Sequence, residues 1–96
     1  MAEKLSSKER EAALAELPEW TWDAERDAIA RTFTFADFSE AFAFMTRVAI
    51  AAEQADHHPD WSNSWNKVEV ALTTHSAGGV SASDIAMARR IDGFAA

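Results

Sequence analysis

The sequence predicts an α+β fold in which three helices cover one face of a four-stranded antiparallel sheet. Apolar and polar residues alternate in two pairs of neighbouring segments, which is typical of β-hairpins. Three other segments repeat apolar residues at intervals of three and four, which is typical of amphipathic helices. These segments follow one another as α-β-β-α-β-β-α, and such an order forms a two-layer sandwich. We expect residues 1–96 to form a single domain.

The first helix and the first hairpin are predicted between residues 6 and 35. Ser6 and Glu9 have the spacing of a capping box, and the helix that follows ends before Pro18. Period-two alternation then runs on both sides of the polar segment 23–27, which indicates a hairpin that turns there. The alternating side chains are Trp20, Trp22, Ile29, Arg31, Phe33 and Phe35.

A longer helix is predicted from Asp37 onward. Thr34 and Asp37 have the spacing of its N-terminal box. Pro59 sets its latest end, because the residue before a proline is pushed out of the α region. One broad apolar face is formed by Phe38, Ala41, Phe42, Met45, Val48, Ala49 and Ala52. This face is broader than the sheet alone can cover, so we expect it also to mediate oligomerisation.

The second hairpin and the last helix complete the chain. We expect the hairpin to turn near Asn66 and Lys67. Val68, Val70, Leu72 and Thr74 then alternate on one face of the final strand. Ser81 and Asp84 form a further capping box, and Gly93 is the expected end of the helix. The residues of this helix that should face the core are Ile85, Ala88 and Ile91.

Composition excludes several classes of function. The 96 residues carry a formal net charge of −7, and nine Lys and Arg scattered among sixteen acids do not form the basic surface that binds nucleic acid. Cysteine is absent, so thiolate chemistry and disulfides are excluded. No apolar run is long enough for a membrane span or a signal peptide. We expect a soluble, cytoplasmic protein.

All three histidines lie where an element is predicted to end. His57 and His58 come directly before Pro59, and His75 follows the last strand. Imidazole titrates near neutral pH, so three of these side chains in one pocket would suit a reaction that needs both an acid and a base. A histidine at a helix C-terminus can also simply interact with the helix dipole. We do not expect a metal site, because neighbouring side chains in extended backbone point apart.

Other residues near the histidines are candidates for supporting roles. We place Trp61 at the mouth of the expected cleft, where its ring could lie against a planar substrate, although tryptophans also fill the cores of small domains. Glu53 and Asp56 are expected in the last turn of the long helix. Either carboxylate could orient an imidazole by accepting its N–H.

Three segments are specific enough to compare with known families: HHPDW (57–61), NKVEVALTTH (66–75) and GGVSASD (78–84). With them, residues 33–92 resemble the pterin-4a-carbinolamine dehydratases. The resemblance implies the removal of water from a 4a-hydroxytetrahydropterin to give the quinonoid dihydropterin, without a metal or an organic cofactor. The reaction would return the cofactor of the aromatic amino-acid hydroxylases to its reductase.

The resemblance also implies a site and partners. His57, His58 and His75 would be catalytic. Our hypothesis gives the two proton transfers to His58 and His75, and gives binding and alternate-face protonation to His57. The expected substrate contacts are His57, His58, Pro59, Trp61, Thr74, His75, Ser76 and Ala77. We expect a homodimer or a homotetramer. The alternative function is a module of the same fold for protein interaction, enzyme assembly or transcriptional coactivation, as in some relatives.

Overall fold

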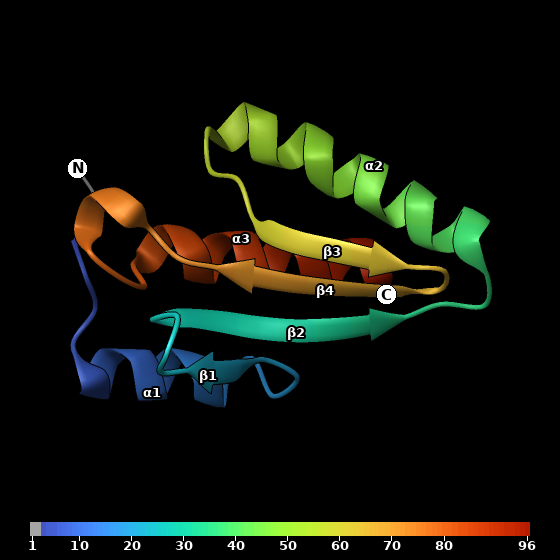
Figure 1. Cartoon of the computed structure of the whole chain (residues 1–96). Helices are drawn as coiled ribbons and strands as arrows, with labels where there is room; N and C mark the ends of the chain where they lie inside the picture. The colour runs from blue at the N-terminus through green and yellow to red at the C-terminus, as the bar shows by residue number, and fades with distance from the viewer. Residues whose placement is uncertain (1–2) are drawn as a thin grey trace.

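The predicted order of elements and the predicted layers are confirmed by the computed structural model, which describes residues 3–96. The elements are α1 (Ser7–Ala15), β1 (Thr21–Asp23), β2 (Ala28–Thr34), α2 (Phe38–Ala55), β3 (Asp60–Ser64), β4 (Lys67–Leu72), the short 3₁₀ helix η1 (His75–Ala77) and α3 (Ala82–Ala95). The four strands form one antiparallel sheet in the order β1-β2-β4-β3 (Figure 1). The two hairpins therefore join through their second strands.

The hydrophobic core lies between one face of this sheet and the helices. In the register of β2 against β4, Ile29 is opposite Leu72 and Phe33 is opposite Val68. All four side chains are at most 2% exposed. Phe44 of α2 packs on this face, with its ring centroid 4.7 Å from that of Phe33. The alternation predicted for the final strand is thus confirmed.

The helix starts follow the predicted capping boxes at α1 and α3. The Ser6 side chain accepts a hydrogen bond from the Glu9 N–H, and the Glu9 carboxylate accepts one from the Ser6 N–H. Both bonds with Ser6 lower the pKa of Glu9 below its usual range. The bond from the Ser6 backbone N–H has the largest effect. Ser81 and Asp84 form the same reciprocal pair at α3.

The end predicted for the last helix is wrong. The helix continues through Gly93 to Ala95, because the cost of a glycine inside a helix is only about 1 kcal/mol. Phe94 and Ala95, which follow the glycine, are partly buried against the core. Their packing favours the longer helix.

The long helix differs from the prediction at its start and on its apolar face. Its N-cap is Asp37, whose side chain accepts from the Glu40 N–H, while Thr34 still belongs to β2. Of the predicted apolar face, only Ala41, Val48 and Ala52 are buried, and the prediction omitted Phe44 and Ala51. The buried residues of this helix are Ala41, Phe44, Val48, Ala51 and Ala52. Phe38 and Phe42 are instead 48% and 56% exposed.

The turn of the second hairpin lies one residue earlier than predicted. β3 ends at Ser64 and β4 already begins at Lys67. Trp65 occupies the turn with a φ of 50°, a left-handed conformation that few non-glycine residues adopt. The Asn66 amide donates to the Phe35 carbonyl, which ties this turn to the segment before α2.

Across residues 3–96, none of the helices has both the length and the apolar character needed to cross a lipid bilayer.

Candidate active site

The C-terminus of α2 determines how two of the three histidines leave the helix. Asp56 ends the helix in the left-handed conformation, with a φ of 50°. The His57 N–H then reaches back to the Ala52 carbonyl, at 3.0 Å, which is the backbone pattern that terminates many helices. Pro59 prevents a further turn. His57 and His58 are therefore held on a fixed corner rather than on a mobile loop.

His57 points into the protein and binds a buried carboxylate. Its Nε2 lies 2.5 Å from Oδ1 of Asp84, the third residue of α3. The Asp84 side chain is completely buried, and that of His57 is 15% exposed. Since a carboxylate only accepts hydrogen bonds, the proton of this contact belongs to Nε2. His57 is left with Nδ1 for any further partner.

The same carboxylate also binds the segment that carries His75. Oδ2 of Asp84 accepts from the Thr74 hydroxyl at 2.7 Å and from the Ser81 N–H at 2.9 Å. The Ser81 hydroxyl lies 2.7 Å from the Thr74 hydroxyl and completes the network by donating to it. Thr74 directly precedes His75 in the chain. Asp84 therefore fixes the ring of His57 and the backbone that leads to His75.

His75 begins the short η1 helix in a tightly closed loop. Thr74 and Gly79 exchange backbone hydrogen bonds of 3.0 and 3.2 Å across this loop. Gly79 has a φ of 159°, and a Cβ atom placed on it would lie 2.6 Å from an Asp27 carboxylate oxygen. A side chain would be strained at this φ, so the conformation favours glycine. Among residues 3–96, the His75 ring has no hydrogen-bond partner of its own.

His58 lies on the outside of the same corner. Its Nε2 is 2.9 Å from Oε1 of Glu53, and the two side chains are 57% and 83% exposed. Of the two carboxylates considered as supports for a histidine, Glu53 makes this contact. Asp56 acts through its backbone, and its exposed side chain has no hydrogen-bond partner in the described part of the chain.

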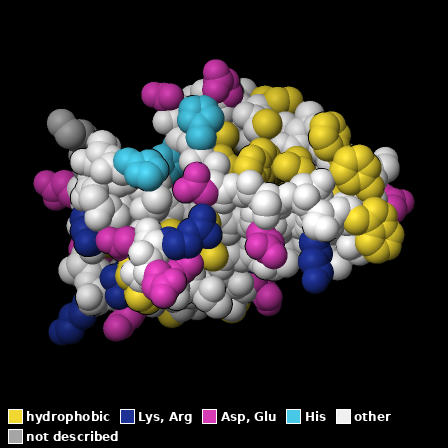
Figure 2. Space-filling view, viewed as in Figure 1, with side chains coloured by type: hydrophobic (Ala, Val, Ile, Leu, Met, Phe, Trp, Pro, Cys, Tyr) yellow, Lys and Arg dark blue, Asp and Glu magenta, His cyan; other side chains and the backbone are white. Residues whose placement is uncertain are grey.

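Histidine side chains gather on one side of the molecule, where the end of α2 faces the loop of η1 (Figure 2). The remaining predicted contact residues accompany them. Pro59 follows the histidine pair, and Ser76 and Ala77 continue η1. Imidazole side chains can both donate and accept protons near neutral pH, so this cluster has the groups that acid–base chemistry needs. No group of three or more His, Cys, Asp or Glu that could hold a metal ion is present within residues 3–96.

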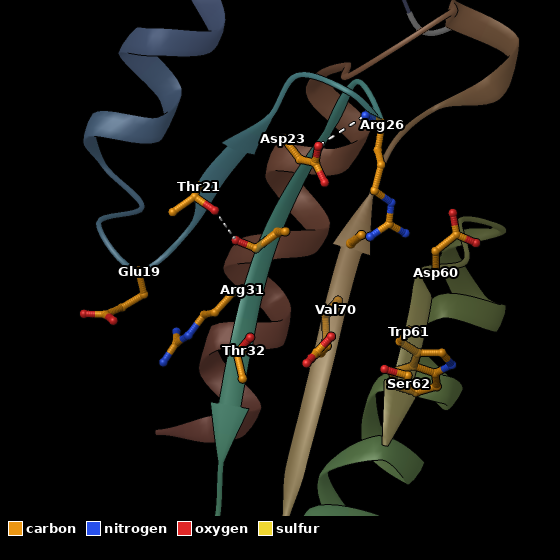
Figure 3. A pocket seen from close by; sticks show the side chains of 13 residues that line it. Glu19, Thr21, Asp23, Arg26, Arg31, Thr32, Asp60, Trp61, Ser62 and Val70 are labelled. Atoms are coloured by element: carbon orange, nitrogen blue, oxygen red, sulfur yellow. Dashed lines mark hydrogen bonds between the residues drawn. The ribbon is translucent and has the colours of Figure 1, made fainter. Parts of the chain in front are cut away.

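Trp61 lies on β3, opposite Val70, and packs partly buried against the core. It also belongs to the lining of a shallow groove of about 670 Å³ across the open face of the sheet (Figure 3). This lining is mostly polar and includes none of the three histidines. Its polar residues include Glu19, Asp23, Arg26, Asp60 and Glu69. The groove is thus separate from the histidine cluster.

Asp84 is the residue of this candidate site that the sequence patterns did not indicate. Its position three residues after Ser81 identifies it as a capping residue. That spacing says nothing of His57, which is 27 residues away in the chain. One signal was available, because the helix start follows the strand end of His75 by only a few residues. A carboxylate at this helix start can therefore contact residues at the end of the strand, such as Thr74.

The comparisons with known proteins agree with the fold. The fold is an α+β sandwich. Its histidines lie near the end of α2 and near the end of β4. The family model for pterin 4 alpha carbinolamine dehydratase matches residues 3–94. The chain belongs to the pterin-4a-carbinolamine dehydratase family.

Relatives cover nearly the whole chain. A Rhizorhabdus wittichii protein is 60% identical over 97% of this chain and 96% of its own length. A Rhodopseudomonas palustris protein is 56% identical over 100% of this chain and 95% of its own. Both are provisionally named pterin-4-alpha-carbinolamine dehydratases.

Two solved structures share the fold. A protein of Brucella melitensis, described as a transcriptional coactivator/pterin dehydratase, has a TM-score of 0.94 at 46% identity and covers 97% of this chain and 99% of its own. A pterin dehydratase-like protein described as a RuBisCO assembly factor of the alpha-carboxysome has a TM-score of 0.62. It is 23% identical over 71% of this chain and 79% of its own, so this second likeness concerns the fold alone.

Proposed function

We propose that the chain converts 4a-hydroxytetrahydropterin to quinonoid dihydropterin and water. The observation that carries this proposal is the Asp84 carboxylate, which joins the His57 ring to the segment of His75. In the reaction, the C4a–O bond breaks as the hydroxyl oxygen takes a proton and leaves as water. N5 loses its proton, and the electron pair of that N–H bond forms the C4a=N5 double bond. One acid and one base are therefore needed.

Histidine supplies both groups at neutral pH. We assign the two proton transfers to His58 and His75, and the binding of the pterin to His57. Glu53 accepts from Nε2 of His58, so the Nδ1 of that ring is free to exchange a proton with substrate. The His75 ring is exposed and has no competing hydrogen bond within residues 3–96. His57 is fixed by its contact with Asp84, which suits a residue that orients the substrate.

The biological role that follows is the recycling of a pterin cofactor. Pterin-dependent aromatic amino-acid hydroxylases release the 4a-carbinolamine, and its dehydration gives the form that a reductase accepts. The proposal requires neither metal nor organic cofactor, because the pterin supplies its own electron pair and the imidazoles supply the protons. The family to which the chain belongs supports this reading.

The direct test generates the 4a-carbinolamine in a stopped-flow instrument and follows its dehydration by absorbance. We expect the purified protein to accelerate dehydration by at least tenfold over the spontaneous rate, since each well-placed acid or base contributes about 10² to 10⁴. Prior dialysis against a chelator should leave the rate unchanged. A rate equal to the spontaneous one would refute the dehydratase proposal.

A second role concerns association. The exposed part of the α2 face repeats at intervals of four, three and four, the spacing of a helix–helix seam. Its residues are the exposed Phe38, Phe42 and Ala49 together with Met45, which is partly buried against the core. The rings of Phe38 and Phe42 lie 5.8 Å apart, and hydrophobic side chains line this side of the molecule (Figure 2). We propose that a second copy of the chain covers this seam, in a homodimer or a homotetramer.

Replacing Phe42 with glutamate should therefore shift the protein to monomer, because a charge at a buried seam is costly. Light scattering after size-exclusion chromatography measures the mass. Ala43→Glu is the matched control, since Ala43 is exposed on the same helix away from the seam, and it should leave the mass unchanged. A wild-type protein that is monomeric at 100 µM, a concentration of the order of 10⁻⁴ M at which a weak dimer already forms, contradicts the proposal.

A further inference from the structure

The loop that carries His75 is held from outside by the N-terminal segment that precedes α1. This segment runs alongside the loop at one end of the sheet (Figure 1). Lys4 pairs with Ser81 in an antiparallel β-bridge, and the Leu5 N–H donates to the Val80 carbonyl at 2.8 Å. These contacts fix the chain just after the loop, where α3 begins.

Asp27, in the turn between β1 and β2, fixes the other end of the same loop. Its carbonyl accepts a hydrogen bond of 2.7 Å from the hydroxyl of Thr73, which lies just before the loop. Its backbone is left-handed, with a φ of 49°, a conformation that few residues other than glycine adopt. Such a conformation persists only where the surrounding contacts hold it, and it is frequent at functional sites.

The side chains of Lys4 and Asp27 form an ion pair that lies directly against the loop backbone. Nζ of Lys4 is 2.9 Å from Oδ2 of Asp27. A Cβ atom placed on Gly79 would lie 2.6 Å from this oxygen and 2.9 Å from Cε of Lys4. Gly79 closes the loop through its two backbone hydrogen bonds with Thr74. The ion pair therefore covers the backbone that sets the position of His75.

His75 depends on its backbone more than the other two histidines do. A carboxylate contacts the ring of His57 and another contacts the ring of His58, whereas the His75 ring has no hydrogen-bond partner within residues 3–96. The reach of its imidazole toward a substrate is therefore set by the loop. A misplacement of about 1 Å can lower a rate about 10²-fold, while an exposed ion pair adds little to overall stability.

We propose that Lys4 and Asp27 are positioning residues for His75: their ion pair holds the loop of residues 74–79 so that the imidazole stays within reach of the pterin. The inference rests on the proposed dehydration, in which His75 carries one of the two proton transfers. It gives this loop a second support besides Asp84, which binds Thr74.

The kinetic test removes the charge of either partner and measures pterin dehydration. Asp27→Asn keeps the size of the side chain and suits the left-handed backbone, and Lys4→Met keeps most of the side-chain length. We expect each variant to lower kcat about fivefold and to leave KM within about twofold of the wild type. Lys4→Arg keeps the positive charge and should retain the wild-type kcat. Lys8→Met is the matched control, because Lys8 is exposed on α1 and makes no ion pair within residues 3–96.

Combination with the histidine variants shows whether the ion pair acts through His75. In the His75→Ala background, Lys4→Met should lower kcat no further, because no imidazole is left to position. In the His58→Ala background, Lys4→Met should still lower kcat about fivefold. An equal loss in both backgrounds, or a wild-type kcat in Lys4→Met alone, overturns the proposal.

Amide hydrogen exchange measures the loop without substrate. The N–H groups of Ala77 and Gly79 both donate to the Thr74 carbonyl inside the loop. We expect them to exchange at least about threefold faster in Lys4→Met than in the wild type and in Lys8→Met. Exchange at the wild-type rate in Lys4→Met also overturns the proposal. If the wild type does not accelerate dehydration, the proposed function fails instead, and the exchange rates still decide whether the ion pair holds this loop.

Discussion

Replacing Asp84 with asparagine is expected to lower the kcat of pterin dehydration by about 10² or more while the protein remains folded. An amide has one acceptor oxygen in place of two. If this oxygen keeps the two bonds to Thr74 and Ser81, the amide NH₂ faces Nε2 of His57. His57 must then accept rather than donate there, so its ring is held in the opposite tautomer. In the serine-protease triad, an equivalent exchange costs about 10⁴ in kcat.

The measurement combines kinetics with spectroscopy. Long-range ¹H–¹⁵N spectra of the imidazoles should show the proton of His57 on Nε2 in the wild type and on Nδ1 in Asp84→Asn. A positioning role predicts that both the tautomer and kcat change together. If kcat stays within threefold of the wild type although the tautomer has changed, Asp84 serves the fold and not the reaction.

Asp84→Ala separates stability from catalysis. This variant leaves the Thr74 hydroxyl, the Ser81 N–H and the His57 ring without their buried acceptor. We expect the free energy of unfolding to fall by about 3 kcal/mol, a typical cost for removing one partner from a buried polar network. Urea unfolding measures it. Glu53→Ala is the control, because Glu53 is 83% exposed and its loss should hardly change stability.

The parts of the site that lie at element ends could be predicted from the sequence. Pro59 sets the latest end of α2, and the alternating pattern places the end of the last strand shortly before His75, although β4 itself ends at Leu72. The positions of the three histidines at element ends therefore followed from local patterns alone. The contact of His57 with Asp84 could not be predicted in this way. It depends on how α2 packs against α3, which no local spacing encodes.

The apolar face of α2 shows the same limit in the fold. Helical periodicity in the sequence indicates an apolar face on α2. When apolar residues are this frequent, however, the periodicity does not tell which of them pack against the sheet. Phe44 enters the core although the predicted face omitted it, whereas Phe42, which belongs to that face, stays exposed. At Gly93 a local propensity was outweighed by the packing of the two residues after it. Tertiary contacts decided both cases.

Single replacements of His58 or His75 by alanine are expected to lower kcat at least tenfold each, and the double replacement by about 10² to 10⁴, because each imidazole carries one of the two proton transfers. Both side chains are exposed and neither takes part in the buried network, so the melting temperature should hardly change. His57→Ala should differ from both, since it leaves the buried Asp84 without its imidazole and so lowers stability as well as rate.

Chemical rescue distinguishes proton transfer from substrate binding. Free imidazole in the buffer can replace a missing proton donor or acceptor, so we expect it to restore part of kcat in His58→Ala and His75→Ala. It should restore none in His57→Ala if that ring binds and orients the pterin. A rescue found only for His57→Ala would reverse the assignment, and the proton transfers would then belong to the histidine that Asp84 holds. If all three variants lose rate, show a raised KM and are not rescued by imidazole, the three histidines bind the pterin but do not transfer protons.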